Sequence, residues 1–168
     1  MVHFDGDFKQ RMQERIERFS RFDQKGDVFS KVGVTVTKGD NLLSEAKPEN
    51  QESSWTSSEN GPSPLAYFVS SLAMCQMTHY AEHVASKGLT IDDLQITIEG
   101  RFRVSRPRLF TEITYFVDIK SPDSIEEIRE LASSAASDCY ITNTLSKACE
   151  VSGLLIVNGK DLGKIGGA

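Results

Sequence analysis

The sequence predicts an α+β fold in which a mostly antiparallel sheet packs around one buried central helix. Residues 64–75 are apolar or small on nearly every side, which is typical of a helix that is buried all round. Residues 94–104 and 113–120 alternate apolar and polar side chains across a short Ser-Arg-Pro-Arg turn. That alternation indicates an antiparallel hairpin. Two further helical patterns and a last apolar strand follow the hairpin.

Composition narrows the class of protein. The 168 residues suit one domain with an extension, and the net charge of −5 disfavours nucleic acid as a partner. No apolar run reaches the roughly 18 residues that a membrane helix needs. The first residues lack the basic and then apolar order of a secretory signal, and three cysteines in such a chain indicate thiols or a redox pair. We therefore expect a cytoplasmic protein with no membrane partner.

The N-terminal segment predicts an amphipathic helix over residues 7–22. Its apolar residues are spaced three or four apart: Phe8, Met12, Ile16 and Phe19. Acidic and basic residues mix on the other faces, which favours packing on the body or on a second subunit over a membrane surface. The pattern stops at residues 24–27. We therefore divide the chain into an N-terminal helical extension, residues 1–26, and a main domain, residues 27–168.

The segment before the central helix predicts one strand and a long loop. Residues 31–37 alternate with period two and are β-branched, and residues 41–44 are a candidate for a short returning strand. Residues 45–60 are polar, so we expect a long surface loop there. Trp55 within it could line a pocket or fix the loop. Next, Ser63 is a candidate N-cap and Pro64 a favoured first helical residue, while Lys87-Gly88 is a helix stop.

The C-terminal third predicts two helical segments and a strand. The first segment starts at residues 121–124 and has an apolar stripe of Ile125, Ile128, Leu131, Ala132 and Ala135. Ser137 or Asp138 could cap the second segment, which begins at Cys139 and runs as far as Ala148. Residues 153–157 predict the last strand, and residues 158–168 a polar, glycine-rich tail.

Three thiols are candidates for chemistry. Cys75 lies about three turns into an apolar helix, where the helix dipole gives no help and burial raises the pKa of a thiol. Cys139 is at a predicted helix N-terminus, which favours the thiolate, although the neighbouring Asp138 opposes it. Cys149 is near the end of the same segment beside an acidic residue. Composition alone leaves Cys75 as either a small buried hydrophobe or a reactive group.

His79 follows Cys75 by one turn on the same face of the helix. A metal site that includes His83 is disfavoured, because eight residues of helix span about 12 Å. We therefore expect no metal and no cofactor. A hydrolase or transferase that uses Cys75 with His79 is possible, but the sequence shows no third group to orient the histidine and no oxyanion donor.

Two motifs together resemble the OsmC/Ohr family, the osmotically inducible and organic hydroperoxide resistance proteins. The first is the Gly-Pro-Ser-Pro start of an apolar helix that contains Cys75, and the second is Asp-Cys-Tyr-Ile-Thr-Asn-Thr-Leu around Cys139. Their order and spacing fit, and so do the hairpin between them and the last strand. The resemblance covers residues 31–157.

The resemblance implies an OsmC-like fold, an intertwined homodimer, and active sites at the subunit interface. It implies a thiol-dependent peroxidase that acts on organic hydroperoxides. Cys75 would attack the peroxide and become a sulfenic acid, and Cys139 would resolve it as an intrachain disulfide. An outside dithiol, a lipoyl group or similar, would then reduce that disulfide.

The chain departs from the family pattern around the first cysteine. Peroxidase members carry a glutamate after the proline that opens the helix, and it orients an arginine from an early strand onto the reactive thiolate. This chain has Leu65 and then Ala66 in place of the glutamate. Residues 28–44, where the arginine would come from, contain two lysines but no arginine, and a lysine does not reproduce the planar bidentate contact of an arginine. Tyr140 stands where a proline is usual. These departures keep a non-enzymatic redox-sensing or small-ligand-binding module open as the alternative function.

Overall fold

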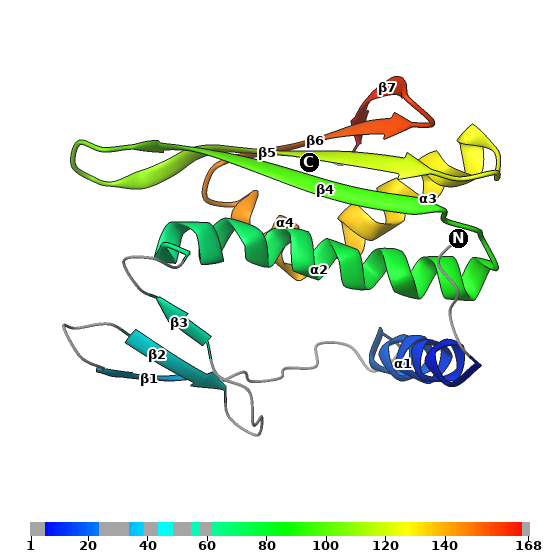
Figure 1. The fold of residues 1–168 in the computed structure, drawn as a ribbon, viewed down its shortest axis with the longest axis horizontal. Coiled ribbons are helices and arrows are strands. Elements are labelled where there is room, and N and C mark those ends of the chain that lie inside the picture. The colour runs from blue at the N-terminus through cyan, green and yellow to red at the C-terminus, as the bar shows by residue number, and fades with distance from the viewer. Residues whose placement is uncertain (1–5, 24–33, 39–43, 49–54, 58–61, 166–168) are drawn as a thin grey trace. The chain divides into compact units, whose positions relative to one another are not determined.

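The computed structural model describes residues 6–23, 34–38, 44–48, 55–57 and 62–165. Figure 1 shows four helices and two sheets among them. The helices are α1 (Gly6–Asp23), α2 (Pro64–Lys87), α3 (Ile125–Asp138) and α4 (Tyr140–Leu145). The strands are β1 (Val34–Lys38), β2 (Ser44–Pro48), β3 (Trp55–Ser57), β4 (Asp93–Arg103), β5 (Leu109–Lys120), β6 (Glu150–Val157) and β7 (Lys160–Ile165). The predicted α+β class is confirmed.

The first sheet is a small antiparallel one of order β1-β2-β3, with Val36 opposite Ala46 and Glu45 opposite Thr56. It belongs to a compact unit of residues 20–68. The predicted strand at 31–37 is confirmed from Val34 on, and its first residues lie outside the described ones. The prediction of one long loop over 45–60 is wrong, because β2 and β3 lie in it. Pairing with β1 and β2 forms these strands despite their polar sequence.

The second sheet has the order β4-β5-β6-β7 and belongs to a unit of residues 1–19 and 69–168. β4 pairs antiparallel with β5, β5 parallel with β6, and β6 antiparallel with β7, so the sheet is mostly antiparallel as predicted. The prediction of a polar tail after residue 157 is wrong. A turn with positive φ at Asn158 and Gly159 returns the chain as β7.

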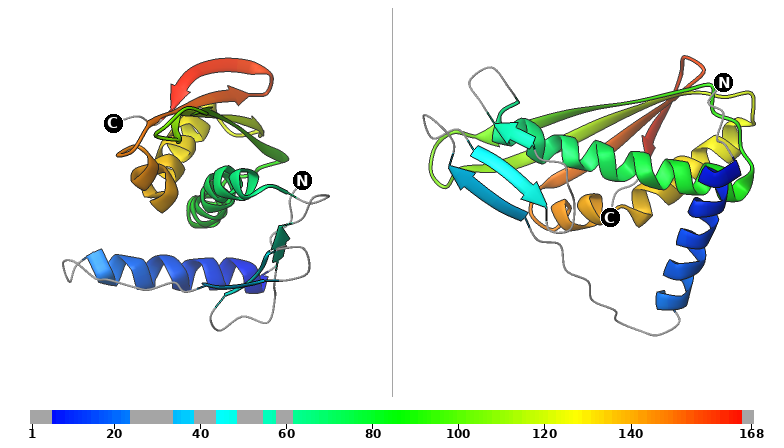
Figure 2. Two further views of the ribbon diagram at one scale, coloured as in Figure 1. Left: turned by 90° about the vertical axis from the view of Figure 1, so that its left-hand side faces the viewer. Right: turned by 60° about the horizontal axis from the view of Figure 1, so that its bottom comes forward.

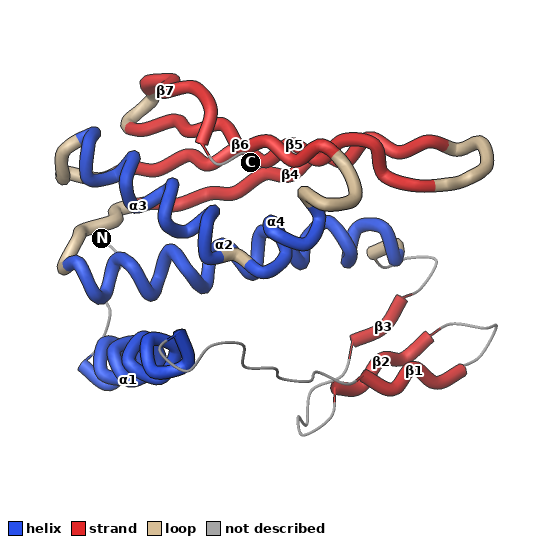
Figure 3. Tube along the Cα trace, turned by 180° about the vertical axis from the view of Figure 1, so that it is seen from behind, coloured by secondary structure: helices blue, strands red, loops and turns tan. Residues whose placement is uncertain are grey.

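Helices α2, α3 and α4 cover one face of the second sheet, as the opposite views of Figures 1 and 3 and the end view of Figure 2 agree. The core lies between these two layers. The β5 side chains that were predicted to face inward are buried there: Ile113, Tyr115, Val117 and Ile119. Gly153 on β6 lies opposite Tyr115, and a Cβ atom at this glycine would be 2.3 Å from the tyrosine Cζ. The tyrosine ring therefore depends on the absence of a side chain there.

The predicted helix ends are confirmed. The Ser63 hydroxyl accepts a hydrogen bond from the Ala66 N–H at 3.2 Å, and Pro64 is the first residue of α2. Gly88 ends α2 with φ of 68°. Ser124 and Glu127 form a capping box at the start of α3.

The predicted burial of α2 on every side is wrong for this chain by itself. Gln76, where the sequence turns polar, is fully buried, whereas Met74 on the opposite side is 68% exposed. Leu65, Phe68 and Met77 are also exposed. One side of the helix packs on the sheet and the other presents an apolar surface.

The predicted N-terminal helix is confirmed as α1, and its first part, through Phe19, belongs to the same unit as α2. Met12 of its apolar stripe lies near α2, and Arg15 of its polar face pairs with Glu82 of α2. The division into residues 1–26 and 27–168 remains a prediction. No helix among the described residues has the length and apolar character needed to cross a bilayer.

Candidate active site

The fold brings Cys75 and Cys139 together, although they are far apart in the sequence. Cys75 is half-buried on α2, and Cys139 is fully buried in the link between α3 and α4. The two thiols are within hydrogen-bonding reach of each other and are not joined by a disulfide. The one-residue link between α3 and α4 therefore places the second sulfur against the first.

The first turn of α4 surrounds both sulfurs with backbone N–H groups. Cys139 caps this helix itself, because its Sγ accepts the Thr142 N–H at 3.4 Å. The N–H groups of Tyr140 and Ile141 point to the Cys75 sulfur and lower the pKa of that thiol. The prediction that Ser137 or Asp138 caps this helix is therefore wrong, and so is its predicted extent to Ala148, since α4 ends at Leu145.

The two thiols share one proton. The hydrogen bond from Cys75 is the main reason why the pKa of Cys139 is lowered to about 5, and bonds from Thr142 add to it. The same hydrogen bond, followed by burial, raises the pKa of Cys75. The pair thus loses its first proton easily and keeps its second, which leaves one negative charge on the two sulfurs at neutral pH.

A buried hydrogen bond between α2 and α4 helps to position the second cysteine. Gln76 follows Cys75 on α2, and its Nε2 donates to the Thr142 Oγ1 at 3.1 Å. Both side chains are buried. Because Thr142 also bonds the Cys139 sulfur, this contact ties the position of the second thiol to α2.

His79 is not alone on the face of α2 that carries Cys75. Its Nδ1 lies 2.8 Å from Oε2 of Glu82, and the Glu82 carboxylate in turn pairs with the Arg15 guanidinium of α1. His79 is 6% exposed and Glu82 7%. The expectation that no third group orients the histidine is therefore wrong. Sequence reasoning missed Glu82, although its positions three residues after His79 and seven after Cys75 place it on the same face.

The other candidate residues, His83 and Cys149, do not contact the two sulfurs in the described part of the chain. His83 pairs with Asp138 at 2.9 Å, and neither residue is paired with His79 or Glu82 in the described part of the chain. Burial raises the pKa of the Cys149 thiol, which donates to the Leu145 carbonyl oxygen. No group of three or more histidine, cysteine, aspartate or glutamate residues in the described part of the chain could hold a metal ion.

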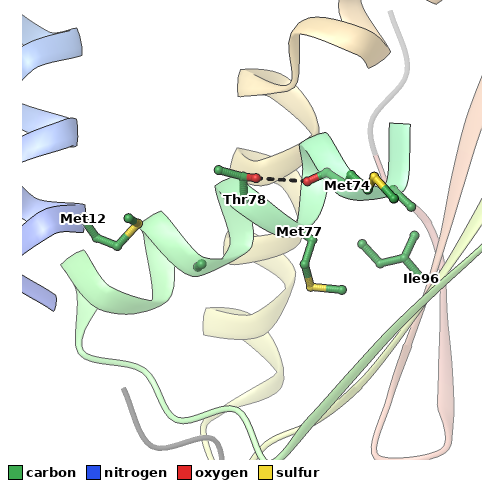
Figure 4. A pocket seen from close by; sticks show the side chains of 7 residues that line it. Met12, Met74, Met77, Thr78 and Ile96 are labelled. Atoms are coloured by element: carbon green, nitrogen blue, oxygen red, sulfur yellow. Dashed lines mark hydrogen bonds between the residues drawn. The ribbon is translucent and has the colours of Figure 1, made fainter. Parts of the chain in front are cut away.

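An apolar cavity of about 460 Å³ adjoins α2 on the side that carries Met74, Met77 and Ala81. Figure 4 shows Met12, Met74, Met77 and Ile96 around it, with the Thr78 hydroxyl turned back to the Met74 carbonyl oxygen at 3.0 Å. Met74 immediately precedes Cys75, but neither cysteine lines the cavity. It is a separate apolar space on the helix that carries the first sulfur.

The glutamate and arginine of the family have no close replacement among the described residues. Leu65 is 45% exposed and offers no carboxylate. The groups that shift the pKa of Cys75 and Cys139 most are each other, burial, Thr142 and backbone N–H groups, with no lysine or arginine among them. The negative charge is thus stabilised by hydrogen-bond donors rather than by a cation.

A fold of this kind with two facing thiols defines a class of dithiol α+β proteins, and comparison with known proteins gives the family. Residues 57–152, which include both cysteines, match the family model for OsmC-like proteins. Because that match covers more than half of the chain, the chain belongs to the OsmC-like family.

Individual relatives agree with this assignment. The hydroperoxide reductase of Mycoplasma genitalium is 30% identical over 89 residues, which are 51% of this chain and 62% of that protein. The chain thus matches less than two thirds of the length of this relative. The OsmC-like protein of Mycoplasma pneumoniae has a solved structure with a TM-score of 0.66 at 22% identity, covering 77% of this chain and 99% of that one. An organic hydroperoxide resistance protein of Elizabethkingia anophelis gives 0.62 at 18% identity, covering 79% and 99%. The predicted OsmC-like fold is confirmed.

Proposed function

We propose that this protein is a thiol-dependent peroxidase that reduces organic hydroperoxides, with Cys75 as the attacking and Cys139 as the resolving residue. The observation that carries the proposal is the hydrogen-bonded contact between these two thiols. A resolving thiol has to reach the sulfur of the sulfenic acid without large movement of the chain, and this contact meets that need.

The chemistry starts from the single negative charge on the pair. A proton moves from Cys75 to Cys139 across their hydrogen bond, and the N–H groups of Tyr140 and Ile141 stabilise the Cys75 thiolate. This thiolate attacks the terminal peroxide oxygen, so that a sulfur–oxygen bond forms, the oxygen–oxygen bond breaks, and an alcohol leaves after it takes up a proton. Cys139 then attacks the oxidised sulfur, a disulfide forms and water leaves. An external dithiol of the lipoyl type reduces the disulfide.

The surroundings of the pair support an apolar substrate and a second copy of the chain. The apolar cavity beside Met74 could receive the hydrocarbon part of a hydroperoxide. Apolar side chains also stay exposed on α2 and on the β4–β5 hairpin: Leu65, Phe68, Met74, Met77, Phe102, Val104 and Leu109. A homodimer that covers them is part of the proposal, because monomeric proteins rarely expose so many large apolar groups.

The test is turnover of cumene hydroperoxide with a lipoyl dithiol as reductant. The wild-type protein should consume peroxide and reductant in equal amounts. Cys75→Ser should abolish consumption, and Cys139→Ser should react once and then stop at a Cys75 sulfenic acid. Cys149→Ser is the matched control and should keep full turnover. If wild type and Cys75→Ser consume peroxide equally slowly, the proposal is wrong.

The second candidate function is a redox sensor, and the lack of a cation beside the sulfurs favours it. A sensor would form the Cys75–Cys139 disulfide with peroxide but would not be reduced again by dithiols at a useful rate. Mass spectrometry of the thiols after one equivalent of peroxide, followed by addition of the dithiol, separates the two functions. Oxidation followed by rapid reduction supports the peroxidase.

A further inference from the structure

We propose that His79, oriented by Glu82 and anchored through Arg15, is the proton donor to the leaving oxygen of the hydroperoxide. This inference rests on the proposed peroxidase function and adds the group that the reaction otherwise lacks. The departing alkyl oxygen is a strongly basic alkoxide, so its departure is slow unless a proton reaches it in the transition state. In this proposal Cys139 keeps its thiol proton until the resolving step, and another group supplies the first one.

The position of His79 suits this role. It follows Cys75 by four residues on α2, so the two Cβ atoms lie about 5–6 Å apart on one face. The side chain is 6% exposed, and its ring lies against the Tyr140 ring of α4, with the ring centres 6.2 Å apart. Tyr140 itself is 60% exposed and forms the outer side of the site. His79 thus lies near both the attacking sulfur and the first residue of α4.

Glu82 determines which ring nitrogen is available. A carboxylate only accepts hydrogen bonds, so the contact of 2.8 Å between His79 Nδ1 and Glu82 Oε2 requires the proton on Nδ1. Among the described residues Nε2 has no hydrogen-bond partner. This nitrogen is therefore the one that can give and take a proton. Glu82 is a positioning residue, as is Arg15, which holds the Glu82 carboxylate from α1.

The Glu82 carboxylate contacts both the His79 ring and the Arg15 guanidinium, which compensates its charge. A buried carboxylate is tolerated when it is paired in this way. Arg15 comes from α1, so the Glu82 carboxylate would lose this ion pair if α1 did not pack on α2.

The step is balanced as follows. The Cys75 thiolate gives two electrons to the terminal peroxide oxygen, and the sulfur–oxygen bond forms. The oxygen–oxygen bond breaks with its electron pair on the alkyl oxygen, which takes the Nε2 proton of His79 and leaves as the alcohol. His79 then accepts the Cys139 thiol proton. The resulting Cys139 thiolate displaces hydroxide from the Cys75 sulfenic acid, and hydroxide leaves with that proton as water.

The experiment compares two oxidants that differ in the need for a proton. Cumene hydroperoxide loses an alkoxide, whereas perbenzoic acid loses a carboxylate that needs no protonation. We expect His79→Gln to slow single-turnover oxidation of Cys75 by cumene hydroperoxide about 10²-fold and that by perbenzoic acid less than about threefold. Glu82→Gln keeps an acceptor for Nδ1 but removes the charge, so it should show a smaller loss with the same selectivity.

His83→Gln is the matched control, since it removes a histidine–carboxylate pair from the same helix, and both rates should stay at the wild-type level. If His79→Gln does not fold, Glu82→Gln alone decides, because only a proton-transfer role makes its loss depend on the leaving group. Equal losses with both oxidants, or no loss with either, would overturn the role of His79 while wild-type activity upholds the peroxidase. A wild-type protein that reacts with neither oxidant overturns both proposals.

Discussion

The hydrogen bond between the two sulfurs makes a quantitative prediction about their titration. In a Cys149→Ala background only Cys75 and Cys139 titrate as thiols. The folded, reduced protein should lose one thiol proton with a midpoint of about 5 and keep the other above the ordinary range. Replacing Cys75 by alanine removes the largest cause of the lowered pKa of Cys139, so its midpoint should rise.

The size of the effect is large at neutral pH. A free cysteine with a pKa of about 8.5 is roughly 3% ionised at pH 7. A thiol with a pKa of about 5 is almost fully ionised there, so the pair should hold about thirty times more thiolate than one free thiol. Cys75→Ala should lose much of this excess. Cys139→Ala should lower the pKa of Cys75, because the hydrogen bond that raises it most is gone.

The assay is the ultraviolet absorbance of the thiolate as a function of pH, with alkylation rates of each cysteine measured in parallel by mass spectrometry. One absorbance step in the wild-type protein near pH 8–9, with two equal thiols, would contradict the hydrogen-bonded pair. A Cys75→Ala variant that still titrates near 5 would show that Thr142 and the N–H groups of α4, not the other sulfur, hold the charge.

The same pair gives the stability of the reduced protein a definite pH dependence. Between about pH 5 and the ordinary thiol pKa of about 8.5, the unfolded chain binds two thiol protons and the folded one binds only one. The free energy of unfolding should therefore rise with pH in this window. Above it the unfolded chain loses both protons while the folded chain keeps that of Cys75, so stability falls again. Melting of the reduced protein across this range, compared with the Cys75→Ala/Cys139→Ala double variant, measures the contribution.

Three further predictions concern the frame of the site. Gly153→Ala should lower the free energy of unfolding by about 1–3 kcal/mol in urea titration, because its Cβ atom would collide with the Tyr115 ring; an unchanged midpoint would contradict this packing. Thr142→Val should lower the free energy of unfolding by about 1–3 kcal/mol, because the buried Gln76 amide loses its acceptor. It should also raise the first thiol midpoint, because the Thr142 side chain helps to lower the pKa of Cys139. Thr142→Ser, which keeps the hydroxyl, is the control. Met74→Glu should shift the protein from dimer to monomer in sedimentation if the exposed side of α2 is the dimer surface, and an unchanged mass would exclude that surface.

The parts of the fold that follow from local pattern were predictable. The β5 alternation, the α3 stripe with its start at residues 121–124, and the helix cap at Ser63 each depend on residues close in sequence, and all are confirmed. A returning strand was a candidate at residues 41–44, but β2 lies at Ser44–Pro48. Its position and the strands β3 and β7 were not predictable, because polar segments become strands only where a neighbour offers its backbone. The cap of α4 was misassigned, since nothing in the sequence favours a cysteine sulfur over Ser137 or Asp138.

The residues of the candidate site were also predictable only in part. Cys75 and Cys139 came from a resemblance between two motifs, and the structure brings them into contact, although their roles are still a proposal. Glu82 was within reach of sequence reasoning, because it shares a helix face with His79. Arg15 was not, since it comes from a separate helix whose docking surface no periodicity specifies.

The surroundings of the Cys75 thiol are therefore set by tertiary structure rather than by its own helix. A thiol three turns inside α2 receives no donors from that helix, whose N–H groups are bound within it. Here the donors come from the first turn of α4, and the Gln76–Thr142 hydrogen bond keeps that turn in place. The family glutamate at the position of Leu65 acts by orienting an arginine. Backbone N–H groups are held in place by the helix and need no carboxylate to orient them. A chain built in this way can lose the family pair of carboxylate and guanidinium and still hold a negative charge at its sulfurs, provided that α4 stays docked on α2.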